Sequence, residues 1–344
     1  MQFIVKPNPS SPLTIVRRCG RLYSLNLIYG AAVLVLFSTG FMLGLLWNAD
    51  SSCLSEPTRE IHKQHASAPS QSAIVEREKT TLLILIMSGP QNLDKRSAIR
   101  DTWVNLIDQR PAQYFFALGT AGLSNKQLKL INDERSQYLD LLIFPEHKDN
   151  YGNITTKLLL SLKHFHQKFE FDFLLKVDDD SFANVDKLFQ ALASHNTKRL
   201  YMGYFQGHAN VKKKGKWSES NWFLCDHYLP YALGGGYVIS GDLVAYIANS
   251  AELLQLYSNE DVSLGTWLAP LKIKRVHDVR FDTEYRSRGC SNDHLISHKQ
   301  SPANMRERFG YLTKYGKLCL VENMGRKSYI YNWTVLPSDC CNFN

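Results

Sequence analysis

The sequence predicts an α/β domain built on a mostly parallel sheet, preceded by one transmembrane helix. Three observations support this prediction. An uncharged apolar run lies near the start, short apolar runs alternate with amphipathic segments after residue 80, and one apolar run ends at three consecutive carboxylates. The chain has 344 residues, of which 44% are hydrophobic. It is therefore too apolar to be disordered and long enough for one large or two ordinary domains.

The apolar run Leu27–Trp47 predicts a membrane-spanning helix with bounds of 25–47. About 20 apolar residues span a bilayer, and residues 22–49 contain no charged side chain. Basic residues precede the run and acidic residues follow it. The positive-inside rule therefore predicts a cytoplasmic tail over 1–24 and a luminal remainder. A cleaved signal peptide is the alternative, but its apolar region is only about 7–15 residues long.

A polar, serine-rich segment, 48–80, follows the apolar run and is expected to be a luminal stem. After it, apolar runs suited to a sheet covered on both faces predict strands over 81–88, 113–118, 140–144 and 171–177. Helices are predicted after Asp94 with Ile99, Trp103 and Ile107 on one side, after a Ser124–Gln127 capping box, and over 154–169. This alternation predicts βαβ units and a mostly parallel sheet.

The stretch LLKVDDDSF, 174–182, places three carboxylates at the end of a predicted buried strand. Asp178 and Asp180 share one face of an extended backbone, whereas Asp179 points away. Two carboxylates on one face suit a hard divalent cation that bridges to the phosphate oxygens of a ligand. The alternative is a solvated turn with a helix cap. Ligands of such sheets gather beyond the carboxyl ends of the strands, so the pattern points to a luminal, metal-dependent, nucleotide-using transferase.

Five segments occur in an order that resembles the β-1,3-galactosyltransferase family, type II membrane enzymes of the Golgi. They are RSAIRDTW (96–103), YGNITTK (151–157), LLKVDDDSF (174–182), YALGGGYVIS (231–240) and EDVSLGTW (260–267). The resemblance covers about residues 81–344 and implies a luminal catalytic domain with a glycosyltransferase-A-like, Rossmann-type fold. It also implies inverting transfer of galactose from UDP-galactose, with Mn²⁺ as the cofactor, by a protein held in the Golgi membrane.

Two C-terminal segments, 277–301 and 338–343, are more particular. They resemble members that act on the linker between glycosaminoglycans and proteins. This implies β-1,3 transfer to a galactosyl-β-1,4-xylosyl acceptor on the core proteins of heparan and chondroitin sulfate proteoglycans. Alternatives are a β-1,3-N-acetylhexosaminyltransferase on other glycans, a luminal glycan-binding protein without catalysis, and a metal-dependent phosphohydrolase. A non-catalytic protein would be expected to lack the metal pair or the base, and both are present.

The resemblance assigns roles to individual residues. Asp261 is expected to be the general base, with Glu260 beside it at a helix start and in contact with the sugar or acceptor. Inversion requires a carboxylate that takes the acceptor proton opposite the leaving nucleotide. Asp178 and Asp180 are the expected metal ligands. Imidazole suits manganese, so a histidine is expected as the third ligand, with His298 preferred to His277.

Donor and acceptor contacts are expected from further residues. Arg96 and Arg100 share a helix face and are expected to bind the diphosphate, since guanidinium groups bind its oxygens in a fork; Lys157 and Asp179 are further donor-binding candidates. Three glycines at 234–236 permit close backbone approach to a sugar ring, so Gly235 and Gly236 are sugar-binding candidates. A glycine bulge is the alternative explanation. Arg286 belongs to a run of alternating charges expected to bind acceptor hydroxyls or, alternatively, to pair with one another at the surface.

Cysteines, sequons and charge complete the predictions. Five luminal cysteines predict two bridges and one free thiol with unreadable pairing: Cys225, Cys290, Cys319, Cys340 and Cys341. No two of them have the C-x-x-C spacing of a zinc site. Cys53 can pair between chains, which allows a homodimer, and Asn153 and Asn332 lie in glycosylation sequons. The formal charge of +8 favours an acidic partner. Nucleic acid is not expected as that partner, because the domain is predicted to be luminal. The basic run 212–216 is expected to be a solvated loop.

Overall fold

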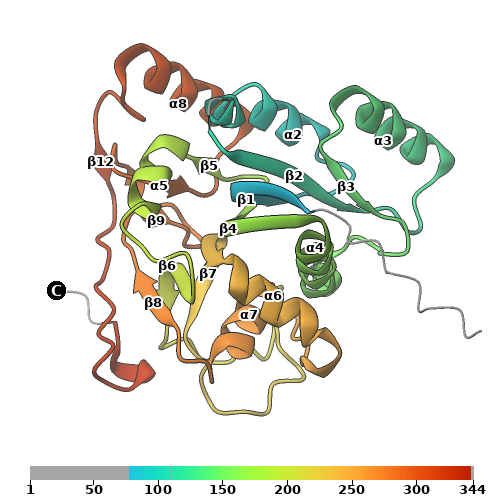
Figure 1. The fold of residues 1–344 in the computed structure, drawn as a ribbon. Helices are drawn as coiled ribbons and strands as arrows, with labels where there is room; N and C mark the ends of the chain where they lie inside the picture. The colour runs from blue at the N-terminus through green and yellow to red at the C-terminus, as the bar shows by residue number, and fades with distance from the viewer. Residues whose placement is uncertain (1–76, 109, 342–344) are drawn as a thin grey trace, which may run out of the picture. The chain divides into compact units, whose positions relative to one another are not determined.

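A computed structural model describes residues 77–108 and 110–341 (Figure 1). The predicted cytoplasmic tail, the predicted transmembrane helix over 25–47 and most of the predicted stem lie outside these residues. Within the described part of the chain, no helix combines the length and the hydropathy needed to cross a membrane.

A seven-stranded sheet forms the centre of the fold, in the order β3-β2-β1-β4-β7-β6-β8. Its strands are β1 (Glu78–Met87), β2 (Ala112–Gly119), β3 (Leu141–Phe144), β4 (Phe169–Asp178), β6 (Leu200–Gln206), β7 (Tyr231–Ser240) and β8 (Lys274–His277). All neighbouring pairs are parallel except those made by β7, which is antiparallel to both β4 and β6. The predicted mostly parallel sheet is confirmed.

Helices cover both faces of this sheet. In Figure 1, α4, α6 and α7 lie on one side, while α2, α3 and α8 lie on the other. The α-helices are α2 (Leu93–Arg100), α3 (Asn125–Tyr138), α4 (Ile154–Lys168), α5 (Val185–Leu192), α6 (Gly241–Asn249), α7 (Glu260–Leu268) and α8 (Pro302–Tyr315). Short 3₁₀ turns are η1 (Trp103–Ile107), η2 (Tyr151–Asn153), η3 (Ala251–Leu253) and η4 (Pro337–Asp339).

Two small sheets complete the domain and bring the C-terminal segments onto it. One has the order β5-β11-β9, from β5 (Phe182–Ala183), β9 (Phe281–Asp282) and β11 (Ile296–Ser297). The other pairs β10 (Gly289–Cys290) with β12 (Asn323–Met324). Because β5 directly follows the three carboxylates and pairs with β11, it sets the residues after β11 beside those carboxylates.

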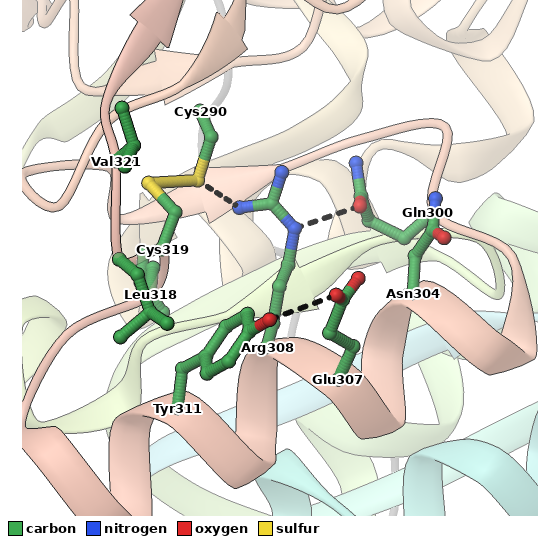
Figure 2. Close-up of a pocket in the computed structure, with 10 residues that line it drawn as sticks. Cys290, Gln300, Asn304, Glu307, Arg308, Tyr311, Leu318, Cys319 and Val321 are labelled. Carbon is green, nitrogen blue, oxygen red and sulfur yellow. Dashed lines mark hydrogen bonds between the residues drawn. A yellow bond between two sulfur atoms is a disulfide. The ribbon is translucent and has the colours of Figure 1, made fainter.

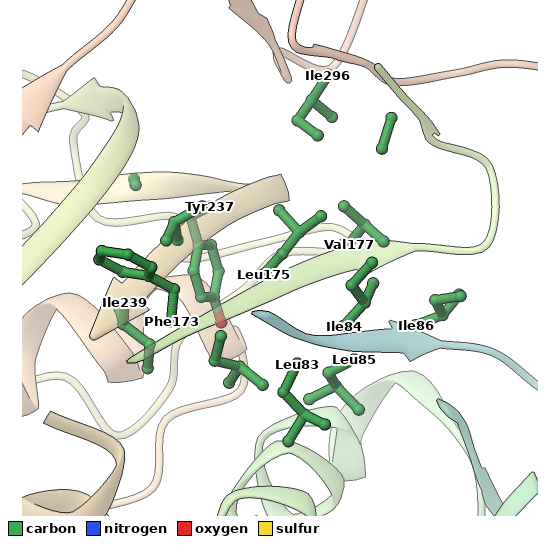
Figure 3. Packing of buried hydrophobic residues seen from close by; sticks show 14 of the residues in the cluster. Leu83, Ile84, Leu85, Ile86, Phe173, Leu175, Val177, Tyr237, Ile239 and Ile296 are labelled. Carbon is green, nitrogen blue, oxygen red and sulfur yellow. The ribbon is translucent and has the colours of Figure 1, made fainter. Parts of the chain in front are cut away.

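The core lies on both faces of the central strands, and Figure 3 shows β1, β4 and β7 packed around it. Leu82–Ile86 of β1 are fully buried, as expected for a strand with helices on both faces. Residues of β4 and β7 pack beside them, including Leu175 and Ile239 (Figure 3). Since the central strands are fixed on both sides, the loops at their ends have a rigid base.

Most predicted elements occur with shifts of one to three residues at their ends. The capping box is present, with the Gln127 N–H donating to Ser124 Oγ. One predicted helix differs: α2 ends at Arg100, and a 3₁₀ turn follows from Trp103 to Ile107. Trp103 and Ile107 are buried as expected, so the apolar spacing located the buried face but not the break.

Candidate active site

A cavity of about 660 Å³ lies beyond the carboxyl end of β4, next to the first residues of β7 and the start of α7. Its lining brings together segments from the whole domain. They include Tyr151, Asp178, Lys212, Lys216, Trp217, Gly234, Gly235, Glu260, Asp261, Thr283, Glu284, Tyr285, His298 and Lys299. The antiparallel pairing of Val177 with Gly236 explains the juxtaposition, because the entry of β7 lies beside the exit of β4.

Asp178, Asp180 and His298 form a group whose ligand atoms lie within 4.8 Å of one another. The Nε2 atom of His298 is 2.9 Å from Asp180 Oδ1 and 3.5 Å from Asp178 Oδ2. Burial alone would raise the pKa of Asp180, but the hydrogen bond with His298 and the charge of Lys299 hold it well below its usual range. Two carboxylate oxygens and one imidazole nitrogen are a donor set that fits Mn²⁺.

His277, the second choice for a metal ligand, lies elsewhere. Its Nδ1 accepts from the backbone N–H of Phe205 at 3.0 Å, and its Nε2 lies 2.9 Å from the carbonyl oxygen of Tyr329. Both ring nitrogens therefore have backbone partners, and burial lowers the pKa of this histidine. The preference for His298 agrees with the geometry.

Each of the three consecutive carboxylates has its own lysine. Lys176 Nζ lies 2.8 Å from Asp178 Oδ1, and Lys299 Nζ lies 3.2 Å from Asp180 Oδ2. Asp179 points the other way, toward α2, where Lys95 Nζ lies 2.9 Å from its Oδ1. Asp179 also accepts from Ser88 and Asn92. Its bonds therefore join the end of β4 to the end of β1 and the start of α2, and its expected role in donor binding stays a prediction.

Asp261 opens α7 and faces the cavity. Its Oδ2 accepts from the N–H of Gly234 at 2.9 Å, and its Oδ1 accepts from the N–H of Val262 at 2.8 Å. Burial and the neighbouring charge of Glu260 raise the pKa of Asp261 to about 8. A carboxylate with a raised pKa, held in place by two backbone donors, is suited to take a proton near neutral pH.

Lys176 links the metal group to the base region. It is fully buried, and its Nζ donates to Asp178 Oδ1, to Glu260 Oε1 at 2.5 Å and to the Gly234 carbonyl at 2.6 Å. Burial alone would lower the pKa of this ammonium, but the charges of Asp178 and Glu260 outweigh burial and raise it. Lys176 was missing from the predicted site, although a lysine inside the apolar run LLKV is itself unusual.

The glycines of β7 make room for the site's own side chains. A Cβ on Gly235 would lie 2.4 Å from Nδ1 of His298, and one on Gly234 would lie 2.7 Å from Oε1 of Glu260. A Cβ on Gly236 would meet the core side chains of Ile296 and Val177. The sugar-binding expectation for Gly236 is therefore corrected to a packing role, whereas Gly235 lines the cavity next to His298.

A second cavity, of about 390 Å³, lies between α8 and the Cys290–Cys319 disulfide (Figure 2). Arg308 donates to Oε1 of Gln300 at 2.8 Å and contacts Sγ of Cys290 at 3.1 Å. Gln300 in turn donates from its backbone N–H to the Asp180 carbonyl and from Nε2 to the His298 carbonyl, each at 2.8 Å. Arg308 thus supports two metal-ligand candidates through Gln300.

Comparisons with known proteins agree with this arrangement. The family model described as "Galactosyltransferase" matches residues 94–279, more than half of the chain. The chain belongs to the galactosyltransferase family. Among its relatives, "Beta-1,3-galactosyltransferase 6" of Mus musculus is 46% identical over 273 residues, which cover 77% of this chain and 83% of that protein.

More distant relatives of this galactosyltransferase carry other names. "UDP-GalNAc:beta-1,3-N-acetylgalactosaminyltransferase 2" of Xenopus laevis is 29% identical over 225 residues, covering 65% of this chain and 45% of that protein. "Probable beta-1,3-galactosyltransferase 5" of Arabidopsis thaliana is 30% identical over 220 residues, covering 60% and 55% respectively. The chain spans about half the length of these two relatives.

The structure corrects the donor-binding role expected of two arginines in this galactosyltransferase. Arg96 is fully buried and forms a two-point pair with Glu134 of α3. Arg100 forms a two-point pair with Asp140 and a third bond to Glu134. These guanidinium groups join α2 to α3 and to the segment that enters β3, and neither lines the cavity.

Lys157 and Arg286 also lie apart from the cavity lining. Lys157 is buried, and its Nζ donates to both carboxylate oxygens of Asp149 and to the Ser88 carbonyl. Arg286 is exposed and stacks over the ring of Tyr285. The structure brings neither residue into the cavity lining, and the ligand-binding roles expected of them stay predictions.

The run of alternating charges after β8 divides into two parts. Arg288 and Asp282 pair with each other, as the alternative predicts, but they do so in the interior and not at the surface. Thr283, Glu284 and Tyr285 instead line the cavity. The buried Oγ1 of Thr283 has no hydrogen-bond partner among the described residues, so it can bond a ligand there.

Among the described cysteines, Cys290 pairs with Cys319 and Cys340 with Cys341, while Cys225 is free and exposed. This confirms two bridges and one thiol. Asn332 is exposed directly before a turn, and Asn153 is partly exposed at the N-cap of α4. In the basic run that was predicted to be a solvated loop, Lys212 and Lys216 line the cavity. Their charge was evident from the sequence, but their position at the cavity was not.

Proposed function

We propose that this galactosyltransferase transfers galactose from UDP-galactose with inversion to a galactosyl-β-1,4-xylosyl group on a proteoglycan core protein, forming a β-1,3 linkage. The observation that carries the proposal is a cavity lined by Asp261 and by Asp178 and His298, two members of the Asp178–Asp180–His298 group. It is further supported by 46% identity to a protein named for β-1,3-galactosyl transfer.

In the proposed reaction, Asp261 takes the proton of the acceptor 3-hydroxyl as that oxygen forms a bond to C1 of galactose. The bond between C1 and the β-phosphate oxygen breaks, and its electron pair leaves with UDP. The two N–H groups on Asp261 hold it in place for this step. Asp178, Asp180 and His298 would hold Mn²⁺, which when bound would neutralise charge on the leaving diphosphate.

Acceptor choice is assigned to the cavity wall formed after β9. Thr283 supplies a buried hydroxyl without a partner among the described residues, and Glu284 supplies a carboxylate held by Arg288 and Arg326. Tyr285 and Trp217 line the same cavity and are exposed, so they can cover the apolar face of a sugar ring. Sites that bond particular hydroxyls strongly reject analogues lacking them.

A donor-by-acceptor assay of the full-length protein in detergent tests the proposal. UDP-galactose with a galactosyl-β-1,4-xyloside should give product in Mn²⁺ and none in EDTA. Equal or better transfer to an acceptor ending in N-acetylglucosamine would reject the linker acceptor, and transfer from a UDP-N-acetylhexosamine would favour the other transferase class. Thr283→Val should raise the KM of the xyloside with little change in the KM of UDP-galactose.

We further propose a single-pass type II protein of the Golgi membrane. The support is the charge asymmetry around Leu27–Trp47. Protease added outside intact microsomes should remove only the short N-terminal tail. Digestion of the C-terminal domain without detergent would reverse the proposed orientation.

A further inference from the structure

The lysines that pair with the three consecutive carboxylates differ in how firmly they are held. The side chain of Lys176 is 0% exposed, that of Lys95 is 31% exposed and that of Lys299 is 47% exposed. Lys176 has three acceptors around its Nζ, and Lys95 pairs with a carboxylate that has two further donors. Lys299 is therefore the lysine of this set that can move most easily.

The Lys299 ammonium contacts the same atoms that would hold a metal ion. Its Nζ lies 3.2 Å from Asp180 Oδ2 and 3.0 Å from His298 Nε2. Asp180 Oδ1 is a carboxylate oxygen that can only accept, so Nε2 of His298 donates to it in this structure. A metal ion bound to Nε2 and Asp180 would take the place of that proton, and the Lys299 ammonium would then lie within about 3 Å of its ligand atoms, where two cations repel. A cation bound by His298 must therefore displace this ammonium.

The backbone around Lys299 is held in place while its side chain is partly exposed. Its φ is +62°, a left-handed conformation that is uncommon outside glycine. The residues on both sides are fixed: the His298 N–H donates to the Asp282 carbonyl, and the Gln300 N–H donates to the Asp180 carbonyl. Such backbone strain persists only where the surrounding structure imposes it, and it is concentrated at functional sites.

We propose that Lys299 is an exchangeable counter-ion of the metal site. It neutralises Asp180 until a divalent cation displaces it, and its ammonium then turns to the diphosphate of the donor. The second step rests on the proposed function. Lys299 lines the cavity, and its flexible four-carbon stem lets the charge move while the backbone stays fixed. When the C1–oxygen bond breaks, the ammonium hydrogen-bonds the UDP oxygen that receives the electron pair, and no proton needs to be transferred.

Mn²⁺ binding measured by calorimetry, without nucleotide, tests the first step on the full-length protein. Lys299→Met removes one competing charge, so Mn²⁺ should bind roughly 3–10 times more tightly. Lys299→Arg should bind Mn²⁺ like the wild type, since it keeps the charge. Lys163→Met is the control, because Lys163 forms an exposed pair with Glu252 and does not line the cavity.

UDP binding and turnover at saturating Mn²⁺ test the second step. Lys299→Met should bind UDP roughly tenfold more weakly and lower kcat, whereas Lys299→Arg should recover part of both. Unchanged or weaker Mn²⁺ binding by Lys299→Met would overturn the exchange, and unchanged UDP affinity and kcat would overturn the contact with the diphosphate. A wild type that binds no Mn²⁺ would overturn the metal-dependent proposed function instead.

Discussion

Replacing Lys176 by methionine should destabilise the domain in a pH-dependent way. Methionine fills similar space without charge, so the change removes the ammonium that Asp178 and Glu260 share while leaving little cavity. Both carboxylates then lie near Asp261 without their cation. Removing one partner of a buried ion pair costs about 3–5 kcal/mol. Because Lys176 is fully buried but Asp178 is partly exposed, we expect about 3 kcal/mol.

The cost should grow as the pH rises. The charge of Lys176 lowers the pKa of Asp261, which burial and Glu260 raise to about 8. Without Lys176 that folded-state pKa rises further, so at neutral pH the folded state binds more protons than the unfolded state. The free energy of unfolding then falls with increasing pH, and protonation relieves the repulsion at low pH. The loss should therefore be larger at pH 8.5 than at pH 5.5.

Urea unfolding of the full-length protein in detergent, followed by tryptophan fluorescence, measures this loss at both pH values. Lys163→Met, which breaks an exposed pair with Glu252, should cost at most about 1 kcal/mol and show no such pH dependence. Adding Glu260→Gln to Lys176→Met should recover a large part of the loss. A loss below about 1 kcal/mol at pH 8.5, or equal losses at the two pH values, would refute the electrostatic role of Lys176.

Three other perturbations test the site. Asp261→Asn should lower kcat by roughly 10²–10⁴-fold while the protein still binds UDP. In the wild type, kcat/KM should rise with pH and level off above about pH 8, where Asp261 loses its proton. A pH-independent kcat/KM would mean that another residue is the base. Gly235→Ala should weaken Mn²⁺ binding at least tenfold, because its Cβ overlaps the His298 ring, whereas Gly310→Ala, with open space around its Cβ, should not. Arg308→Met should raise the Mn²⁺ concentration needed for half-maximal activity. If the variant and the wild type need the same Mn²⁺ concentration, the hydrogen bond from Arg308 is not needed to position Gln300.

The sheet was predictable because its signals are local. Apolar runs of strand length and the Ser124–Gln127 capping box each lie within a few residues, and the strands and helices predicted after residue 80 appear in the structure, with the helix after Asp94 shorter than predicted. The proximity of Asp178 and Asp180 was predictable for the same reason, since a period of two places them on one face. The break between α2 and the turn at Trp103 was not, because apolar spacing reports the buried face and not the helix end.

Partners distant in the sequence explain the errors at the site. Arg96 and Arg100 share a helix face, and that spacing is equally compatible with an exposed phosphate site and with a buried network. Both arginines are buried because they pair with Glu134 and Asp140, which lie 34–40 residues later in the sequence. Charged residues are rarely buried unpaired, so the pairing determines burial, and one sequence does not reveal the pairing.

The charges of the site explain how a strand can end in three carboxylates. Asp178, Asp179, Asp180, Glu260 and Asp261 are matched by Lys95, Lys176 and Lys299. With Asp261 ionised, this set has a formal charge of −2, which one divalent cation would neutralise. A donor diphosphate adds negative charge at the same place, and Lys212 and Lys216 line the cavity that would receive it. If Lys299 turns from Asp180 to the diphosphate, the cation replaces its charge at the carboxylates and the ammonium adds its own to the leaving group. By this count the cluster would carry −2 with Lys299 in place and no cation, and −1 with the cation bound and Lys299 turned to the diphosphate.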